Sequence, residues 1–160
     1  MERTEKRIIP MFLSDEQILK YKIMSREACE RYCKQKHDRS SVVISIKSTW
    51  DRVDPKVFAN DINGVKHILF LAIDDIEAED DPRSAMNEDQ GKLVADFVNA
   101  YYDETDRIII HCDGGISRSA GVGAAIMRVK EGSDYPIFRS RRKSPNMTCY
   151  LATLKGFCYI

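Results

Sequence analysis

Three short runs of apolar residues divide the chain and have the character of buried β-strands. They cover residues 42–46, 68–73 and 107–111, and a weaker run at 21–24 precedes them. The runs are rich in β-branched residues and almost uninterrupted. This pattern favours strands that are covered on both faces, as in a parallel sheet.

Between these runs, apolar residues recur at the 3.6-residue period of amphipathic helices. Ser25 can cap one helix, and Asn87 can cap a second, with Gln90 in the return position of a capping box. Two further helices are predicted over 119–131 and 147–157. Strands that alternate with helices predict an α/β fold, in which a central, largely parallel, twisted sheet is flanked by helices.

Composition and charge narrow the class of protein. The 160 residues are enough for a single domain spanning 1–160, in which the segment 1–20 has no assigned role. Lys and Arg number 25, as do Asp and Glu, so no excess of positive charge favours nucleic acid or a membrane surface as a partner. The charged N-terminus lacks the apolar stretch of a secretory signal, and five irregularly spaced cysteines do not indicate a disulfide framework. We therefore expect a monomer in the cytoplasm.

The candidate chemistry follows the third apolar run, where residues 111–119 read His-Cys-Asp-Gly-Gly-Ile-Ser-Arg-Ser. Ligands of parallel sheets bind beyond the carboxyl ends of the strands, which is where this segment lies. Gly114 and Gly115 allow successive backbone N–H groups to point at an anion, and the next helix adds the partial positive charge of its N-terminus. Arg118 supplies a planar fork that matches two oxygens of a phosphoryl group.

The same positive field acts on Cys112. A thiol beside a helix N-terminus and an arginine has a depressed pKa, and its thiolate is a nucleophile for phosphorus. His111 can fix the loop through nearby backbone groups, and Ser119 can offer its hydroxyl to the sulfur. The segment therefore predicts a cysteine nucleophile beside a bound phosphate.

The pattern His-Cys-x-x-Gly-x-x-Arg-Ser, from His111 to Ser119, resembles the signature loop of the cysteine-dependent protein tyrosine phosphatases. The chain is similar to the dual-specificity branch of that superfamily, including its small bacterial members, over roughly 40–160. The resemblance implies the fold of these phosphatases and a phosphocysteine intermediate, with no metal or other cofactor. It also implies that Asn146 braces the loop. The residues that would surround the phosphate are Asp113, Gly114, Gly115, Ile116, Ser117 and Arg118.

The general acid should come from the segment that follows the second apolar run, because expulsion of an alkoxide or phenoxide needs a proton. Six acidic residues lie between positions 71 and 81. The resemblance implies an aspartate a few residues beyond the apolar strand, and Asp75 fits this best. Asp74 is the second choice, and Asp80 or Asp81 would serve if the loop folds back.

The leading interpretation is a phosphatase that hydrolyses phosphotyrosine in proteins or peptides, with phosphoserine and phosphothreonine as further candidates. An alternative keeps the mechanism but takes a non-protein ester, namely an inositol phosphate, a phosphoinositide or an RNA 5′-phosphate. The variable loop positions contain no lysine, and acidic Asp113 disfavours such polyanionic substrates. A third interpretation is a non-catalytic phosphate-binding module, against which the intact Cys112, Arg118 and Ser119 argue.

The spacing of Cys29, Cys33 and His37 superficially suggests a metal site. A fourth ligand at a suitable spacing is missing, and both cysteines lie on the apolar side of a predicted helix. We therefore expect these cysteines to be packed in the core.

Overall fold

The computed structural model describes residues 13–52, 58 and 63–160. Its strands are β1 (Tyr21–Ser25), β2 (Ser41–Lys47), β3 (Val65–Ala72) and β4 (Arg107–Cys112). They form one sheet in the order β1-β4-β2-β3, and each pairing is parallel. The parallel α/β fold predicted from the sequence is therefore confirmed.

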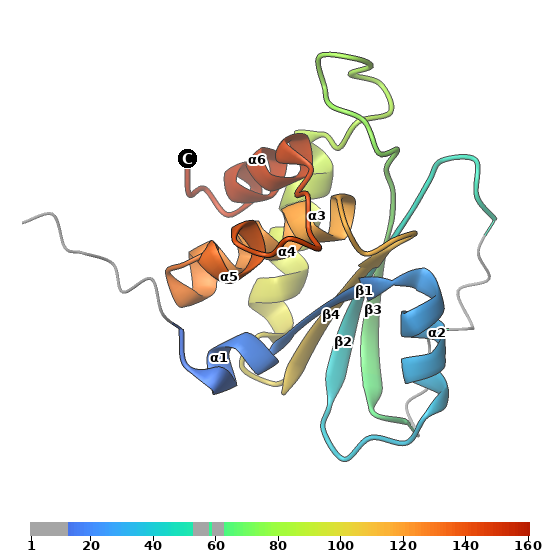
Figure 1. Cartoon of the computed structure of the whole chain (residues 1–160), viewed down its shortest axis with the longest axis vertical. Coiled ribbons are helices and arrows are strands. Elements are labelled where there is room, and N and C mark those ends of the chain that lie inside the picture. The colour runs from blue at the N-terminus through green and yellow to red at the C-terminus, as the bar shows by residue number, and fades with distance from the viewer. Residues whose placement is uncertain (1–12, 53–57, 59–62) are drawn as a thin grey trace, which may run out of the picture.

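Helices cover both faces of this sheet (Figure 1). They are α1 (Asp15–Leu19), α2 (Arg26–Lys34), α3 (Glu88–Tyr101), α4 (Arg118–Glu131), α5 (Tyr135–Phe138) and α6 (Met147–Gly156). Helix α2 lies on one face, and α3, α4 and α6 pack together on the other. The short α1 and α5 were not predicted, because four or five residues show no apolar period. In the described part of the chain, no helix is both long and apolar enough to cross a membrane.

Side-chain caps set the starts of two helices at the predicted positions. The Ser25 hydroxyl accepts a hydrogen bond from the backbone N–H of Ala28 at the start of α2. Asn87 and Gln90 form a reciprocal capping box at the start of α3. These caps satisfy backbone donors that have no partner within the first turn of a helix.

Alternate residues of the central strand β4 belong to two separate hydrophobic clusters. Ile108 and Ile110 pack in the larger cluster with side chains from α3, α4 and α6. Ile109 packs in the smaller cluster, which also contains Cys29 and Cys33 of α2. All three isoleucines are fully buried, as expected for a strand that is covered on both faces. The two cysteines are core residues, as their position on the apolar side of the helix indicated.

The carboxyl ends of the four strands lie at one edge of the sheet. Ser25 at the end of β1 pairs in register with Cys112 at the end of β4, and Lys47 of β2 pairs with Ala72 of β3. The segments that follow these residues come together at this edge, as is usual for the ligand sites of parallel sheets.

Helix α4 approaches the segment before α6 so closely that the contact requires a glycine. A Cβ atom on Gly121 would lie 2.3 Å from the backbone oxygen of Asn146 and 3.1 Å from the Cβ of Cys149. This close approach holds Asn146 beside the start of α4.

We predict that Gly121→Ala destabilises the protein, although alanine is the better helix former by about 1 kcal/mol. The added methyl group would meet backbone atoms, which cannot turn aside as the end of a flexible side chain can. Overpacking of this kind costs about 1–3 kcal/mol. Urea unfolding followed by circular dichroism measures the difference in the free energy of unfolding. A variant that is more stable than the wild type would contradict this account.

Candidate active site

The loop between β4 and α4, residues 113–117, has a backbone shape that requires glycine at one position. Gly115 has a φ of 70°, and a Cβ atom there would lie 2.4 Å from the backbone carbon of Met24. Gly114 has only the Ile116 side chain nearby, so the constraint falls on Gly115. The backbone N–H of Arg26 donates to the backbone oxygen of Asp113 at 3.2 Å, which fastens the loop to the start of α2.

Cys112 ends β4 and is 2% exposed. Its Sγ lies 3.0 Å from the Oγ of Ser119 and accepts a hydrogen bond from the backbone N–H of Gly115 at 3.3 Å. Burial acts to raise the pKa of the thiol, but hydrogen bonds from Ser119 and Gly115 and the charge of Arg118 outweigh it. The pKa of Cys112 therefore lies below its ordinary value, which favours the thiolate.

His111 is completely buried and links two strands beneath the loop. Its Nε2 lies 2.6 Å from the Oγ of Ser45 on β2, and its Nδ1 lies 3.2 Å from the backbone oxygen of Cys112. The ring stacks on Phe58 with centroids 4.7 Å apart. Burial holds the pKa of His111 below its ordinary value. The contact with a backbone oxygen was expected, whereas the contact with Ser45 was not.

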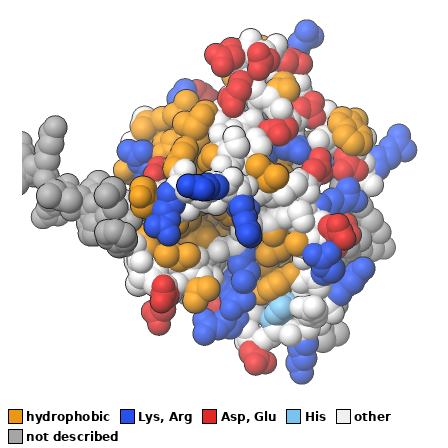
Figure 2. All heavy atoms as spheres, viewed as in Figure 1, with side chains coloured by type: hydrophobic (Ala, Val, Ile, Leu, Met, Phe, Trp, Pro, Cys, Tyr) orange, Lys and Arg blue, Asp and Glu red, His pale blue; other side chains and the backbone are white. Residues whose placement is uncertain are grey.

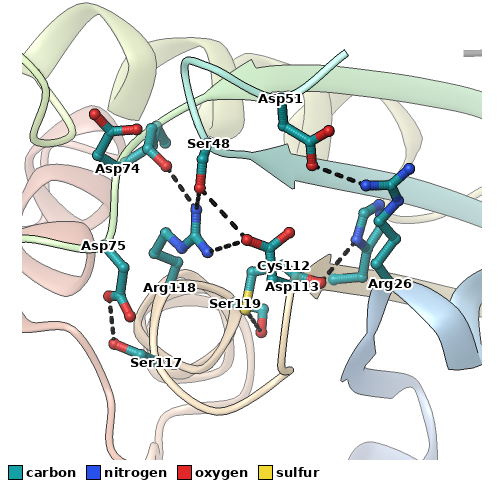
Figure 3. A network of polar contacts seen from close by, with 12 residues as sticks. Arg26, Ser48, Asp51, Asp74, Asp75, Cys112, Asp113, Ser117, Arg118 and Ser119 are labelled. Atoms are coloured by element: carbon teal, nitrogen blue, oxygen red, sulfur yellow. Dashed lines mark hydrogen bonds and ion pairs between the residues drawn. The ribbon is translucent and has the colours of Figure 1, made fainter. Parts of the chain in front are cut away.

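Arg118, the first residue of α4, points its guanidinium across the carboxyl ends of the strands (Figure 3). Its Nη1 donates to the Oγ of Ser48 at 2.9 Å and to the backbone oxygen of Ile73 at 2.8 Å, while its Nη2 donates to the Oδ2 of Asp113 at 3.0 Å. The residue is 4% exposed. Its Nε is buried and has no hydrogen-bond partner among the described residues.

The segment after β3 carries the candidate general acids. Acidic side chains gather at the projecting loop at the top of Figure 2, which is the segment after β3 in Figure 1. Asp75 is exposed, and its Oδ1 accepts hydrogen bonds from the Oγ of Ser117 at 2.7 Å and from the Nδ2 of Asn146 at 3.2 Å. Asp74 instead accepts hydrogen bonds from the backbone N–H and hydroxyl of Thr49. Asp75, not Asp74, is therefore the residue that contacts the loop.

Asp80 and Asp81, the other two candidates for the general acid, lie farther along the same segment. The Asp81 carboxylate accepts hydrogen bonds from the backbone N–H of Arg83 and the hydroxyl of Ser84 within its own turn. Asp80 is exposed, and its backbone N–H donates to the backbone oxygen of Glu77. Among the described residues, neither carboxylate is seen to form a hydrogen bond or an ion pair with the loop.

Asn146 joins three segments at the site. Its backbone N–H donates to the backbone oxygen of Ser117 at 2.9 Å, its Oδ1 accepts from the N–H of Cys149 at the start of α6, and its Nδ2 donates to Asp75 and to the backbone oxygen of Ile76. Contact with the loop was expected from the family resemblance. The contacts with the acidic segment were not.

Ser48 and Lys143 also contact the site, although neither was among the predicted site residues. Ser48, which contacts Arg118 and Asp113, stands directly after the end of β2, and this position at a strand end was the signal that could have identified it. Lys143 donates to the backbone oxygens of Gly115 and Ile23. It belongs to a cluster with Arg139, Arg141 and Arg142, which could meet an anionic substrate but which the sequence alone favours as a solvated run of charge.

In the described segments, 13–52 and 63–160 with residue 58, no group of three or more His, Cys, Asp or Glu side chains is arranged to bind an ion.

We predict that Ser119→Ala raises the pKa of Cys112, because the variant loses a hydrogen bond that favours the thiolate. Alkylation of Cys112 by iodoacetamide, followed by mass spectrometry of its peptide across a pH series, should show a midpoint at higher pH than in the wild type. The exposed Cys158 provides an internal reference whose alkylation should not change. An unchanged Cys112 midpoint would mean that this hydroxyl does not stabilise the thiolate.

No family model and no curated protein sequence matches the chain. Solved structures do match it. Tk-PTP in its active form aligns with a TM-score of 0.57 and 18% identity, over 86% of this chain and 88% of that chain. Human DUSP28 aligns with a TM-score of 0.58 and 15% identity, over 89% and 94%. PTPMT1 in complex with PI(5)P aligns with a TM-score of 0.51 and 14% identity, over 86% and 87%. The chain therefore has the fold of the dual-specificity and protein tyrosine phosphatases, as the loop motif predicted.

Proposed function

We propose that the protein is a cysteine-dependent phosphatase that hydrolyses phosphotyrosine in proteins or peptides through a phosphocysteine intermediate. One observation carries this proposal. The thiol of Cys112, with its lowered pKa, and the buried guanidinium of Arg118, whose Nε makes no hydrogen bond among the described residues, stand at the two ends of the loop between β4 and α4. A nucleophile and a phosphate-binding fork at the ends of one loop are the two groups that displacement at phosphorus needs.

In the first step, backbone N–H groups of residues 113–117 and the guanidinium of Arg118 bind the equatorial oxygens of the phosphoryl group. The Cys112 thiolate attacks phosphorus, so that an S–P bond forms while the P–O bond to the leaving group breaks. The leaving oxygen takes a proton from Asp75, whose contacts with Ser117 and Asn146 hold it beside the loop.

In the second step, water attacks phosphorus and the S–P bond breaks. The Asp75 carboxylate, left ionised by the first step, accepts a proton from the water. The electron pair of the broken bond returns to Cys112 as a thiolate, which the hydroxyl of Ser119 stabilises. Inorganic phosphate then leaves, and each residue has recovered its initial protonation state.

The charge of the loop favours a protein substrate over a polyanionic one. Asp113 presents a half-exposed carboxylate at the loop, and none of the variable loop positions carries a basic side chain. A second phosphate on the same small molecule would be repelled there. PTPMT1, which has a similar fold, is described in complex with PI(5)P, so non-protein esters form the alternative against which this proposal is tested.

The wild type should release nitrophenol from para-nitrophenyl phosphate in the presence of a chelator and should hydrolyse phosphotyrosine peptides faster than inositol phosphates. Cys112→Ser should abolish both activities and still bind tungstate, because a serine hydroxyl is not ionised at neutral pH while the loop survives. Absence of turnover by the folded wild type would favour a binding module, and faster turnover of inositol phosphates would identify a non-protein substrate.

Asp75→Asn should slow the hydrolysis of phosphotyrosine by about 10²–10⁴-fold, the usual contribution of a general acid. Para-nitrophenyl phosphate should be affected much less, because its leaving group departs without a proton. The basic limb of the pH–rate profile should flatten in the variant. Asp74→Asn is the matched control, since Asp74 bonds to Thr49, and should retain the shape of the wild-type profile. The opposite result would assign the acid to Asp74.

A further inference from the structure

We propose that Asp113 and Ser48 are positioning residues, which hold one edge of the Arg118 guanidinium so that the other edge faces the phosphate. This inference rests on the proposed function, because it concerns the same loop. From the sequence, Asp113 was expected only as a residue of the phosphate-binding loop, and Ser48 had no assigned role.

The hydrogen-bond donors of Arg118 are only partly engaged by the protein. A guanidinium has five N–H groups in one plane. Three of them are engaged, two by the hydrogen bonds of Nη1 to Ser48 and Ile73 and one by that of Nη2 to Asp113. The two that remain are the Nε–H and the second N–H of Nη2, which lie side by side on one edge. This edge is the fork that binds two oxygens of a phosphate.

The opposite edge is closed by a ring of hydrogen bonds (Figure 3). Ser48 Oγ accepts from Nη1 of Arg118 and donates to Oδ2 of Asp113 at 3.4 Å, and the same Oδ2 accepts from Nη2. Two acceptors joined to each other fix both the direction and the rotation of the guanidinium plane. A single acceptor would leave the plane free to tilt.

Ser48 can act in this way because its own turn is held at both sides. The backbone N–H of Asp51 donates to the backbone oxygen of Ser48 at 3.1 Å, and the Asp51 carboxylate forms an ion pair with Arg26 at 2.8 Å. Thr49, between them, donates to the Asp74 carboxylate. The position of the hydroxyl is therefore set before any ligand arrives.

The contrasting possibility is that the Asp113 carboxylate occupies the place of a phosphate and competes with it. The two accounts predict opposite effects of removing the charge. A competing carboxylate weakens anion binding, so its loss would tighten it. A positioning carboxylate orients the fork, so its loss would weaken anion binding even though a negative charge has gone.

The test measures tungstate binding by calorimetry and turnover of para-nitrophenyl phosphate in Asp113→Ala, Asp113→Asn and Ser48→Ala. We expect Asp113→Ala and Ser48→Ala to bind tungstate about tenfold more weakly. A misplaced fork should also lower kcat by up to about 10²-fold with a smaller change in KM. Asp113→Asn retains an acceptor oxygen and should recover part of the loss. Glu79→Gln is the matched control, because it removes one charge from the neighbouring exposed acidic segment and should leave both measurements within about twofold.

Tighter tungstate binding by Asp113→Ala and Asp113→Asn alike would overturn the inference and identify Asp113 as a competitor. Unchanged tungstate binding and kcat in Ser48→Ala would overturn the inference as well. If Asp113→Ala fails to fold, Ser48→Ala alone tests the inference. A wild type that binds tungstate but hydrolyses no phosphate ester would contradict the proposed phosphatase activity alone. A wild type that binds no tungstate would overturn both.

Discussion

The buried positive charge of Arg118 is the interaction on which the arrangement of the site depends. A guanidinium cannot lose its proton in a protein, so its burial is stable only where acceptors surround it. Here the acceptors are Ser48, Ile73 and Asp113, which follow the carboxyl ends of β2, β3 and β4. Because these strands run parallel, their carboxyl ends lie together and bring all three acceptors to one point. The arrangement of the strands therefore fixes the position of the Arg118 guanidinium, and the guanidinium in turn ties the three strand ends together.

The sequence could predict what short-range patterns determine. The strands follow from apolar runs, the starts of α2 and α3 from capping residues, and the placement of Cys112, Arg118 and Ser119 from a single nine-residue segment. The phosphatase fold followed from the resemblance of that segment to a signature loop. Each of these inferences concerns residues that are close together in the chain.

The remainder of the site depends on contacts between distant residues. Ser48 and Arg118 are 70 positions apart, and Asp75 and Asn146 are 71 apart. Asp74 and Asp75 differ because the Asp74 carboxylate accepts a hydrogen bond from Thr49, whereas the Asp75 carboxylate accepts one from Ser117 of the loop. No local sequence pattern predicts these contacts, because they form only where the ends of the strands come together in the fold. A sequence of adjacent acids gives several candidates, and only the packing separates them.

The fold persists at 14–18% identity with the similar structures, and the chemistry of the site suggests how. Several of its hydrogen bonds use backbone groups, such as the N–H of Gly115 on the sulfur and the oxygen of Ile73 on Arg118. Backbone groups are supplied by any amino acid. These backbone contacts can survive substitution of the residues that supply them, whereas the contacts of Ser48, Asp113 and Asn146 depend on their side chains.

Asn146 has a consequence for motion at the site, because its two amide atoms serve different segments. The Oδ1 atom caps α6 through the N–H of Cys149, whereas the Nδ2 atom binds Asp75 and the backbone oxygen of Ile76. Displacement of the acidic segment would break the bonds to Nδ2. It would also break those of the Glu77 carboxylate, which accepts hydrogen bonds from the backbone N–H groups of Met147 and Thr148 at the start of α6. Only the cap on Oδ1 would remain. Movement of the acid would therefore leave the first turn of α6 with one side-chain cap in place of two, so that the position of the acid and the stability of this helix end are coupled.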